Sequence, residues 1–390
     1  MKINSKKKSS IISILAIIFA FTIVFSMLSI NSKNEAFAES DYTTKINNYL
    51  TEYYINIEDN VKNRTAGTVG EKFMANTLAT YLETNGFAKY GELEGYLQEF
   101  KIKNGNSNNV LGVVDNNKEK YIVIGAHYDA VYKSGKSYGY NDNFSGIVAN
   151  MIMAETLKTQ TEFNVIVGFW GAEEIGCEGS TYFAKNLPSE IRENIMLYIN
   201  FDSIGAGDYL YYYHNDFETK YGDTLDKFFK DSEIKKYGNQ LYSNNANLGI
   251  NYTNLGLNSD NSSFLKMAIN SLNFFAGNLD ANNGLGFFET AGHDKIMHNT
   301  DSKETINEVF GEKFVANINT VLLQTTALIE SEYFTAENFS DGQIKTFLFS
   351  DWVLKGIGVS VVAIMFVAYV VYNKTTNSAS LPDRRNFNEQ

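Results

Sequence analysis

The sequence is short of cysteine, proline and positive charge, and the first and last of these shortages exclude whole classes of protein. Cys177 is the single cysteine in 390 residues, so the chain cannot form an intrachain disulfide. No cysteine lies near the N-terminal apolar run, which excludes a lipoprotein anchor there. Lysine and arginine number 33 against 45 acidic residues, and this net charge of -12 argues against binding nucleic acid by neutralising phosphates. The two prolines point to no particular function.

The first 38 residues have the order of a secretory signal peptide. Four lysines within the first eight residues precede an uncharged run over residues 11–30. Ala36-Phe37-Ala38 then has the small-x-small form of a signal-peptidase site. We expect residues 1–38 to be removed. A retained N-terminal anchor is the alternative, because the apolar run is long enough to span a bilayer.

A second uncharged run, residues 356–372, lies near the C-terminus. Trp352 and Lys355 stand at its border, as in the interfacial anchors of a membrane span, so we predict a transmembrane helix over 352–373. The polar tail 374–390 carries Lys374, Arg384 and Arg385, which favours a cytoplasmic C-terminus. A buried core helix is the less favoured alternative. We therefore expect a single-pass protein of the cell membrane whose main domain lies outside the cell.

Residues 39–335 are predicted to form one domain, joined to the span by a juxtamembrane segment over 336–351. This region contains no internal repeat and no low-complexity linker, and 44% of the chain is hydrophobic, enough for a full core. Strands alternating with helices predict an α/β three-layer sandwich with a mixed, mostly parallel central sheet. The expected strands are 97–102, 110–114, 121–126, 163–171, 195–201, 209–214 and 271–276. The expected helices are 47–85, 144–157, 179–186, 219–230, 260–268 and 306–330.

Acidic and imidazole side chains follow three of the expected buried strands. YIVIGA runs into His127, FNVIVGFWGA runs into Glu173 and Glu174, and IMLYINF runs into Asp202. In α/β sheets ligands bind beyond the carboxyl ends of the strands, so we expect these side chains to meet at one edge. Asp142, in the loop YNDNFSG, could join them there.

Each of these residues also has an ordinary structural interpretation. A lone histidine at a strand end is usually a hydrogen-bonded surface residue, although Asp129 could orient the ring of His127. Glu173 and Glu174 would repel each other unless a cation lay nearby, and an unpaired carboxylate after an apolar strand is costly. The remaining three histidines are His214, predicted to be a polar strand residue, and His293 and His298, which compete for a ligand role.

The candidate ligands are two imidazoles and three carboxylates, without a thiolate. This set suits zinc, and also manganese or cobalt. Five ligands are too many for one tetrahedral ion. They suit two ions, about 3.5–4 Å apart, that share a bridging carboxylate.

Five motifs in order connect the chain to a known family. GAHYDA, NDNFSG, WGAEEIGCEGS, NFDSIG and MHNTDS together resemble the di-zinc exopeptidases of the bacterial leucyl aminopeptidase type. That family also contains glutaminyl cyclases and glutamate carboxypeptidase-like proteins. RTAGTVGEKFMANTLATYLETNGF resembles its N-terminal helical region and SDNSSF its later Ser-Asp loop. The resemblance implies a mixed sheet of about eight strands between helices.

The resemblance also implies a role for each site residue. One zinc would be held by His127 and Asp202, and the second by Glu174 and His298. The resemblance thus favours His298 over His293 as the ligand. Asp142 would bridge the ions, with an unusual cis peptide bond to Asn143. The catalytic residues would be Glu173, as general base and acid, and Asp129, which would orient His127.

Two positions depart from the pattern. Met297 replaces a tyrosine that many relatives carry before the last histidine, and Asn261 replaces a histidine after the Ser-Asp pair. The carboxylate that would bind the substrate's amine is left between Glu289 and Asp280.

The expected activity is an aminopeptidase that acts on peptides with two zinc ions per chain. A glutaminyl cyclase with a single zinc is the alternative, although YNDNFSG keeps the Asp-Asn-x-Ser-Gly form of the di-zinc branch. A non-catalytic receptor-like module is less favoured, because every ligand position is filled.

Overall fold

The structure is a computed structural model of the chain. The predicted signal peptide, the predicted membrane span and the predicted cytoplasmic tail lie outside the residues that it describes. Within the described residues, no helix combines the length and the apolar composition that crossing a bilayer requires. The described residues are 41–60, 63–159, 162–215, 219–237, 259–278, 289–290, 293 and 296–339.

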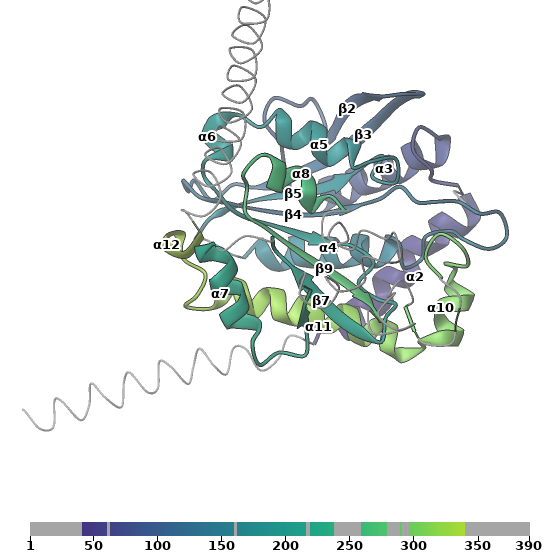
Figure 1. The fold of residues 1–390 in the computed structure, drawn as a ribbon. Helices are drawn as coiled ribbons and strands as arrows, with labels where there is room; N and C mark the ends of the chain where they lie inside the picture. Colours follow the sequence, from purple (N-terminus) through teal and green to yellow (C-terminus); the bar gives the residue numbers. More distant parts are fainter. Residues whose placement is uncertain are drawn as a thin grey trace, which may run out of the picture.

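One nine-stranded mixed sheet runs through the domain (Figure 1), in the order β1-β3-β5-β4-β6-β9-β7-β8, with β2 paired to β3. The central strands β5, β4, β6 and β9 are parallel, whereas β3 joins them on one side and β7 on the other in antiparallel orientation. The strands are β1 (Ala88–Lys89), β2 (Leu97–Ile102), β3 (Gly105–Val114), β4 (Tyr121–His127), β5 (Asn164–Trp170), β6 (Ile195–Phe201), β7 (Tyr209–Tyr213), β8 (Lys235–Lys236) and β9 (Ser271–Gly277). The mixed α/β sheet is confirmed, but the prediction that it is mostly parallel is wrong, because four of its eight strand pairs are antiparallel. The parallel pairs among β5, β4, β6 and β9 lie in the centre, where crossover helices connect the strands, and the fourth parallel pair is β7 with β8.

The central strands are apolar throughout because both of their faces are covered. In β5, Val165, Val167 and Phe169 join one apolar cluster, while Ile166 and Trp170 join a second cluster on the opposite face. This alternation follows from the two-residue period of a strand. The sheet is therefore the middle of three layers.

Helices cover the two faces unequally (Figure 1). The larger cluster receives α2, α3, α4, α7, α10, α11 and α12, and the smaller one receives mainly α5 and α8. The helices are α2 (Thr43–Asn60), α3 (Val69–Thr84), α4 (Phe144–Leu157), α5 (Glu178–Lys185), α6 (Ser189–Arg192), α7 (Lys220–Phe229), α8 (Asn261–Lys266), α10 (Lys303–Val309), α11 (Glu312–Glu330) and α12 (Ala336–Phe339). Phe339 of α12 is buried, so the start of the predicted juxtamembrane segment packs against the domain.

Two helices predicted as continuous are each divided. The predicted helix over 47–85 is α2 and α3, and α3 begins at its N-cap Thr68, whose hydroxyl accepts a hydrogen bond from the Glu71 amide. The predicted helix over 306–330 is α10 and α11, which Gly311 separates with φ of 52°. Glycine adopts this left-handed conformation at little cost, so it ends α10 where apolar periodicity alone continues.

Candidate metal centre

Three predicted site segments meet at the carboxyl edge of the central strands. β4 ends at His127, which pairs with Trp170 at the end of β5. β6 lies on the other side of β4 and ends one residue before Asp202. The loops that follow these strands, together with Asp142 before α4 and His298 before α10, surround one small volume.

The buried ring of His127 faces three carboxylates. Its Nε2 atom lies 3.2 Å from Asp142 Oδ1, 3.4 Å from Asp202 Oδ1 and 3.9 Å from Glu173 Oε2. These contacts join the ends of β4, β5 and β6 to the loop before α4. His127 and Asp202, predicted to share one ion, are therefore neighbours.

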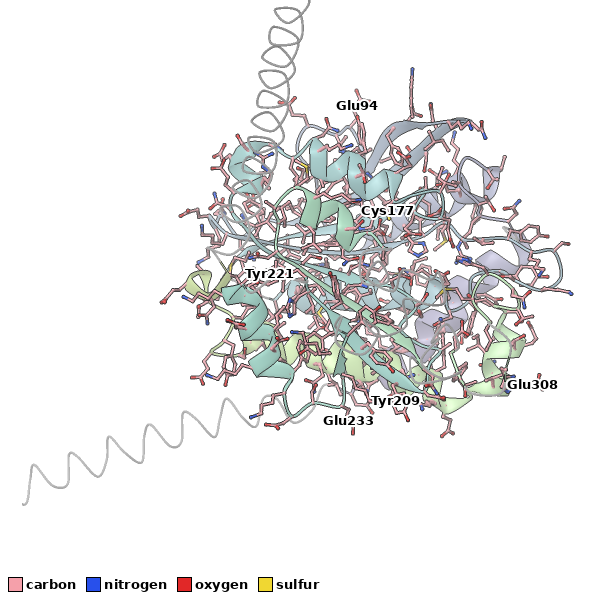
Figure 2. The ribbon with its side chains drawn as sticks, viewed as in Figure 1. Glu94, Cys177, Tyr209, Tyr221, Glu233 and Glu308 are labelled. Atoms are coloured by element: carbon pink, nitrogen blue, oxygen red, sulfur yellow. The ribbon has the colours of Figure 1, made fainter. Side chains whose placement is uncertain are left out.

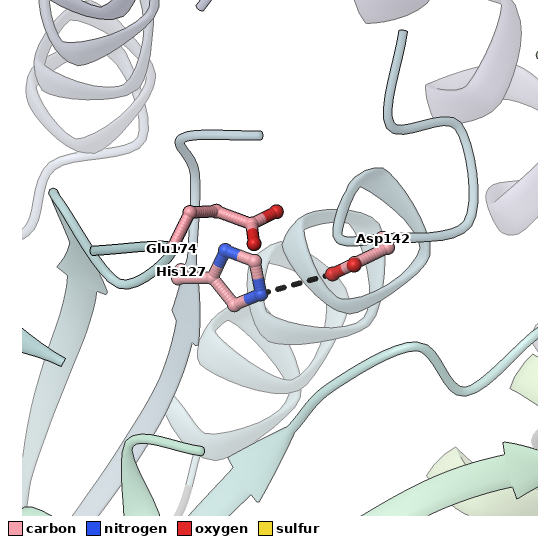
Figure 3. Close-up of side chains that lie close together, drawn as sticks. All are labelled: His127, Asp142 and Glu174. Atoms are coloured by element: carbon pink, nitrogen blue, oxygen red, sulfur yellow. Dashed lines mark ion pairs between the residues drawn. The ribbon is translucent and has the colours of Figure 1, made fainter. Parts of the chain in front are cut away.

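A second group of donors forms around His298. Its Nε2 atom lies 2.8 Å from Asp142 Oδ2 and 3.0 Å from Glu174 Oε2. Asp142 thus turns one oxygen toward each histidine. Figure 3 shows the inner part of this arrangement, in which donor atoms of His127, Asp142 and Glu174 all lie within 4.8 Å of one another.

The loop that carries Asp142 is held on two sides. Its peptide bond to Asn143 is cis, as the family resemblance implied. The backbone amides of Asn141 and Asp142 each donate a 2.8 Å hydrogen bond to the carboxylate of Asp301, three residues beyond His298. The side-chain oxygen of Asn143 accepts a hydrogen bond from the Ser203 amide, beside Asp202. The three ligand loops therefore fix one another.

Asp129 supports the glutamate pair as well as His127. Its carboxylate accepts hydrogen bonds from the backbone amides of Glu173, at 2.9 Å, and Glu174, at 3.2 Å. The Nδ1 atom of His127 is 3.2 Å from the Asp129 carbonyl oxygen and 3.7 Å from its carboxylate. The His127 ring thus lies closer to the backbone carbonyl of Asp129 than to its carboxylate. The Asp129 carboxylate positions the backbone of Glu173 and Glu174.

A second carboxylate, Glu71 at the start of α3, braces the same loop. It accepts hydrogen bonds from the Ser107 hydroxyl and from the backbone amides of Gly67 and Ala172. Burial raises the pKa of Glu71 to about 7, against the opposing effect of these hydrogen bonds. The Thr68-x-x-Glu71 pattern marks a helix start in the sequence, but nothing in it indicates this long-range contact.

Backbone strain is concentrated around the site. Among the described residues, six other than glycine have positive φ, and four of them are Ala172, Cys177, Ser203 and His298. These four lie on the loops that carry the candidate ligands. Such conformations cost free energy and persist where the surrounding structure enforces them, which is typical of functional sites.

The pKa values record how crowded the carboxylates are. Burial raises the pKa of Glu173 well above its usual range, and burial together with Asp142 raises that of Glu174 to about 7. Burial opposes protonation of His298, but its hydrogen bonds to Asp142 and Glu174 outweigh burial and raise its pKa to about 10. Burial opposes ionisation of Asp142, but hydrogen bonds with His127 and His298 outweigh it and hold the pKa of Asp142 below its usual range. The cluster therefore favours positive charge at its centre.

The donor set fits zinc. Ligand atoms about 2.0–2.2 Å from a tetrahedral zinc lie roughly 3.3 Å from one another. His127 Nε2 lies 3.2 and 3.4 Å from its two aspartates, and His298 Nε2 lies 2.8 and 3.0 Å from its two carboxylates. Burial raises the pKa of the nearby Cys177 thiol, which keeps the free thiol protonated.

The candidate centre opens into a pocket of about 470 Å³. Its wall includes Asp142, Glu173, Glu174, Asp202 and His298. Cys177, labelled in Figure 2, lies beside them at the start of α5, with its sulfur 3.4 Å from Glu173 Oε1. Met297 also lines the pocket, so the position of the relatives' tyrosine does face the site.

The remaining candidates lie elsewhere. His214 is buried 3.0 Å from Asp226, and His293 is exposed, which supports His298 as the ligand. Glu289 is buried, and its two carboxylate oxygens accept hydrogen bonds from the backbone amides of Ile296 and Met297. It therefore shapes the loop before His298. Asp280, the other candidate for amine binding, lies outside the described residues.

The sequence analysis missed two acidic residues at the site. Asp301 stands in the quoted motif MHNTDS, but only the fold reveals that it holds the Asp142 loop. Asp260, at the start of α8, is fully buried, and burial raises its pKa to about 7. Within the described residues no well-formed hydrogen bond reaches its carboxylate, although the Ser180 hydroxyl lies close enough to lower its pKa. The SDNSSF motif was the sequence signal from which Asp260 could have been identified.

Parts of the chain are similar in sequence to curated proteins. An aminopeptidase of Pseudomonas aeruginosa is 36% identical over 122 residues, which are 30% of this chain and 20% of that one. Leupeptin-inactivating enzyme 1 of Streptomyces exfoliatus is 29% identical over 176 residues, 44% of this chain and 37% of that one. The match thus spans only 20% to 37% of the length of these curated relatives.

Two solved structures share the fold. LapA of Legionella pneumophila superposes with a TM-score of 0.52 at 17% identity, covering 77% of each chain. Porphyromonas gingivalis glutaminyl cyclase superposes with a TM-score of 0.50 at 16% identity, covering 73% of this chain and 96% of that one. At such identity these likenesses concern the fold alone.

The family itself is decided by a sequence model. The model of peptidase family M28 matches residues 109–318, more than half of the chain. The matched region contains every candidate ligand from His127 to His298. The resemblance noted in the five motifs is confirmed, and the chain belongs to peptidase family M28.

Proposed function

We propose that the chain is a zinc-dependent aminopeptidase that removes N-terminal residues from peptides, and that it holds two zinc ions. Family membership supports a peptidase. The observation that carries the two-ion proposal is the position of Asp142, whose Oδ1 faces His127 and whose Oδ2 faces His298. A carboxylate between two donor groups suits a bridging ligand.

In this proposal the ligands are His127 and Asp202 on one side, Glu174 and His298 on the other, and Asp142 between them. Zinc supplies positive charge that polarises a carbonyl and makes a water acidic near neutral pH. The remaining steps belong to the protein's own side chains.

Glu173 is the proposed general base. Its carboxylate lines the pocket and lies 3.9 Å from His127 Nε2. This places it close to the proposed ligands but farther from His127 than Asp142 and Asp202 are. It takes the proton of the attacking water and returns a proton to the leaving amine. The amides of Glu173 and Glu174 are held by Asp129, which keeps the base at a constant distance from the ligands.

The test uses the full chain, purified in detergent, with aminoacyl-anilides and short peptides as substrates. We expect N-terminal hydrolysis, two zinc ions per chain by mass spectrometry, loss of activity with a chelator and recovery with zinc. One ion per chain, with cyclisation of N-terminal glutamine in place of hydrolysis, would instead support the cyclase alternative. Absence of both reactions would contradict the proposal.

We further propose that the domain acts outside the cell and is tethered by a helix over 352–373. The support is the signal-like segment 1–38 and the uncharged run 356–372. Added protease on intact cells should remove the domain and leave a short membrane-bound fragment. A domain that stays protected, or is recovered in the soluble fraction after lysis, would contradict the tether.

A further inference from the structure

Lys266 gives the pocket a feature that metal chemistry does not use. α8 contributes Ser262 and Lys266 to the pocket wall, next to Gly176, Cys177 and Met297. Ser262 and Lys266 are four residues apart, so they lie on the same side of the helix. Ser262 is buried, whereas the Lys266 side chain is exposed to solvent.

Among the residues that the structure describes, the ammonium group of Lys266 has no partner that would hold it elsewhere. Within the described residues, it makes no ion pair, hydrogen bond or aromatic contact. Lys133, on the loop whose Val131 amide binds Glu174, is different, because its ammonium donates a hydrogen bond to Asn299. Lys266 is also the one lysine or arginine among the described residues of the pocket wall.

The helix that carries Lys266 is firmly seated. Phe264 is fully buried and stacks on Tyr198 with ring centroids 3.7 Å apart. The Ser263 hydroxyl hydrogen-bonds with those of Ser180 and Thr181 on α5. The backbone that carries Lys266 is therefore held in place, so its ammonium stays within reach of the pocket.

All four carboxylates of the pocket wall belong to the candidate metal centre or to its base, so none of them is assigned to neutralise Lys266. A substrate that reaches from the centre to the mouth would meet this uncompensated positive charge. A pocket of about 470 Å³ is of the size that encloses a small ligand, here one terminal residue or a very short peptide.

We propose that Lys266 is a specificity-determining residue that binds a carboxylate of the substrate. This inference rests on the proposed aminopeptidase function. The carboxylate has two sources, the side chain of an N-terminal glutamate or aspartate, or the free C-terminus of a two- or three-residue peptide. Substrates with a basic group at the same place would be disfavoured by repulsion.

The experiment compares paired substrates on the full chain in detergent. One pair is glutamyl- and glutaminyl-anilide, which tests the side-chain source. The other is tri-leucine with a free or an amidated C-terminus, which tests the chain-end source. We expect the acidic member of one pair to have a kcat/KM about fivefold higher, mainly through a lower KM, as is typical of an ion pair exposed to solvent.

Variants assign that preference to the residue. Lys266→Met should remove the preference and Lys266→Glu should reverse it. Lys185→Met removes an equal charge from exposed α5, away from the pocket wall, and should keep it. If the wild type has the same kcat/KM for both members of each pair, or if a preference survives in Lys266→Met, this inference alone would be overturned. A wild type that hydrolyses none of the substrates would overturn the proposed function, and this inference with it.

Discussion

The described residues contain two histidine–carboxylate clusters, and they balance their charges differently. At the end of β7, His214 Nε2 lies 3.0 Å from Asp226 Oδ1, which also accepts a hydrogen bond from Tyr212. Lys236 pairs with the other oxygen of Asp226. One carboxylate there is shared by three donors, so the cluster is complete within the protein.

The cluster at the edge of the central strands is the opposite case. Two imidazoles face five carboxylates within 4 Å, and no lysine or arginine of the described chain pairs with them. Burying so many acidic groups together is costly unless cations compensate them. The comparison shows that a surplus of one charge, rather than the presence of histidine, distinguishes a candidate metal centre from a structural ion pair.

The largest effect on activity is expected when the cations that balance the second cluster can no longer bind. Asp142→Ala deletes the carboxylate shared by both donor groups, so we expect activity to fall to background and metal content to drop from two ions per chain. Chelation should lower the melting temperature of the wild type, because bound metal stabilises only the folded state. The variant should show a smaller shift. Equal metal content in the two proteins would contradict the bridging role.

Removing the proposed base should preserve the metal and stop the chemistry. Glu173→Gln is expected to lower kcat/KM for a leucyl-anilide by about a thousandfold, within the range of general-base catalysis. Its zinc content should equal that of the wild type. The matched control is Asp226→Asn in the complete cluster, which should stay within about twofold. If Glu173→Gln retains a tenth of the activity, the base lies elsewhere.

Weakening the support of the centre should affect stability moderately. In Asp301→Asn, the side-chain NH₂ would face a backbone amide of Asn141 or Asp142 that now donates to a carboxylate oxygen. Leaving such a buried donor unpaired costs about 1–3 kcal/mol of unfolding free energy. Urea unfolding would measure it, against exposed Asp231→Asn as the control, which should change by less than about 0.5 kcal/mol. Equal stabilities would show that the loop holds without Asp301.

The smallest effect is expected from the complete cluster, as a pH dependence. Burial of Asp226 opposes ionisation, but hydrogen bonds from His214 and Lys236 outweigh it and lower its pKa from 3.8 to about 2. A lowered pKa means that the folded state holds the proton less tightly. The stabilisation is therefore present above pH 3.8 and is lost as the pH falls through about 2.

The Asp226 side chain is 33% exposed, so solvent screens its charge and we expect the contribution to be about 1 kcal/mol or less. Asp226→Asn should be less stable than the wild type at pH 7, and the difference should shrink between pH 4 and pH 2. Unfolding free energies measured across this range would check the sign. A difference that grows on acidification would contradict the assignment.

Much of the fold was predictable because its signals are local. The apolar run 195–201 and the mixed run 97–102 are strands with the expected bounds, and 144–157 is a helix with the expected bounds. The divisions at Thr68 and Gly311 were not foreseen, since apolar periodicity continues across them. The site was predictable for a related reason, because the strand ends themselves carry its acidic residues.

The supporting contacts could not be read from the chain. Asp301 and Asn141 are 160 residues apart, and Glu71 and Ala172 are 101 apart. Lys266 follows the SDNSSF motif, but nothing in that motif indicates that this lysine faces the pocket. Such partners depend on which loops the sheet order brings together.

By itself, the sequence determined the alternation of buried strands and helices and the residue types at the strand ends, because burial and side-chain chemistry are properties of local stretches. The tertiary structure alone decided that Asp142 turns one oxygen toward each histidine and that Asp129 holds the amides of both glutamates. It also decided that Lys266 reaches the pocket. These arrangements arise from the order in which strands pair, since hydrogen bonds and charges act over a few ångströms in space whatever the separation along the chain.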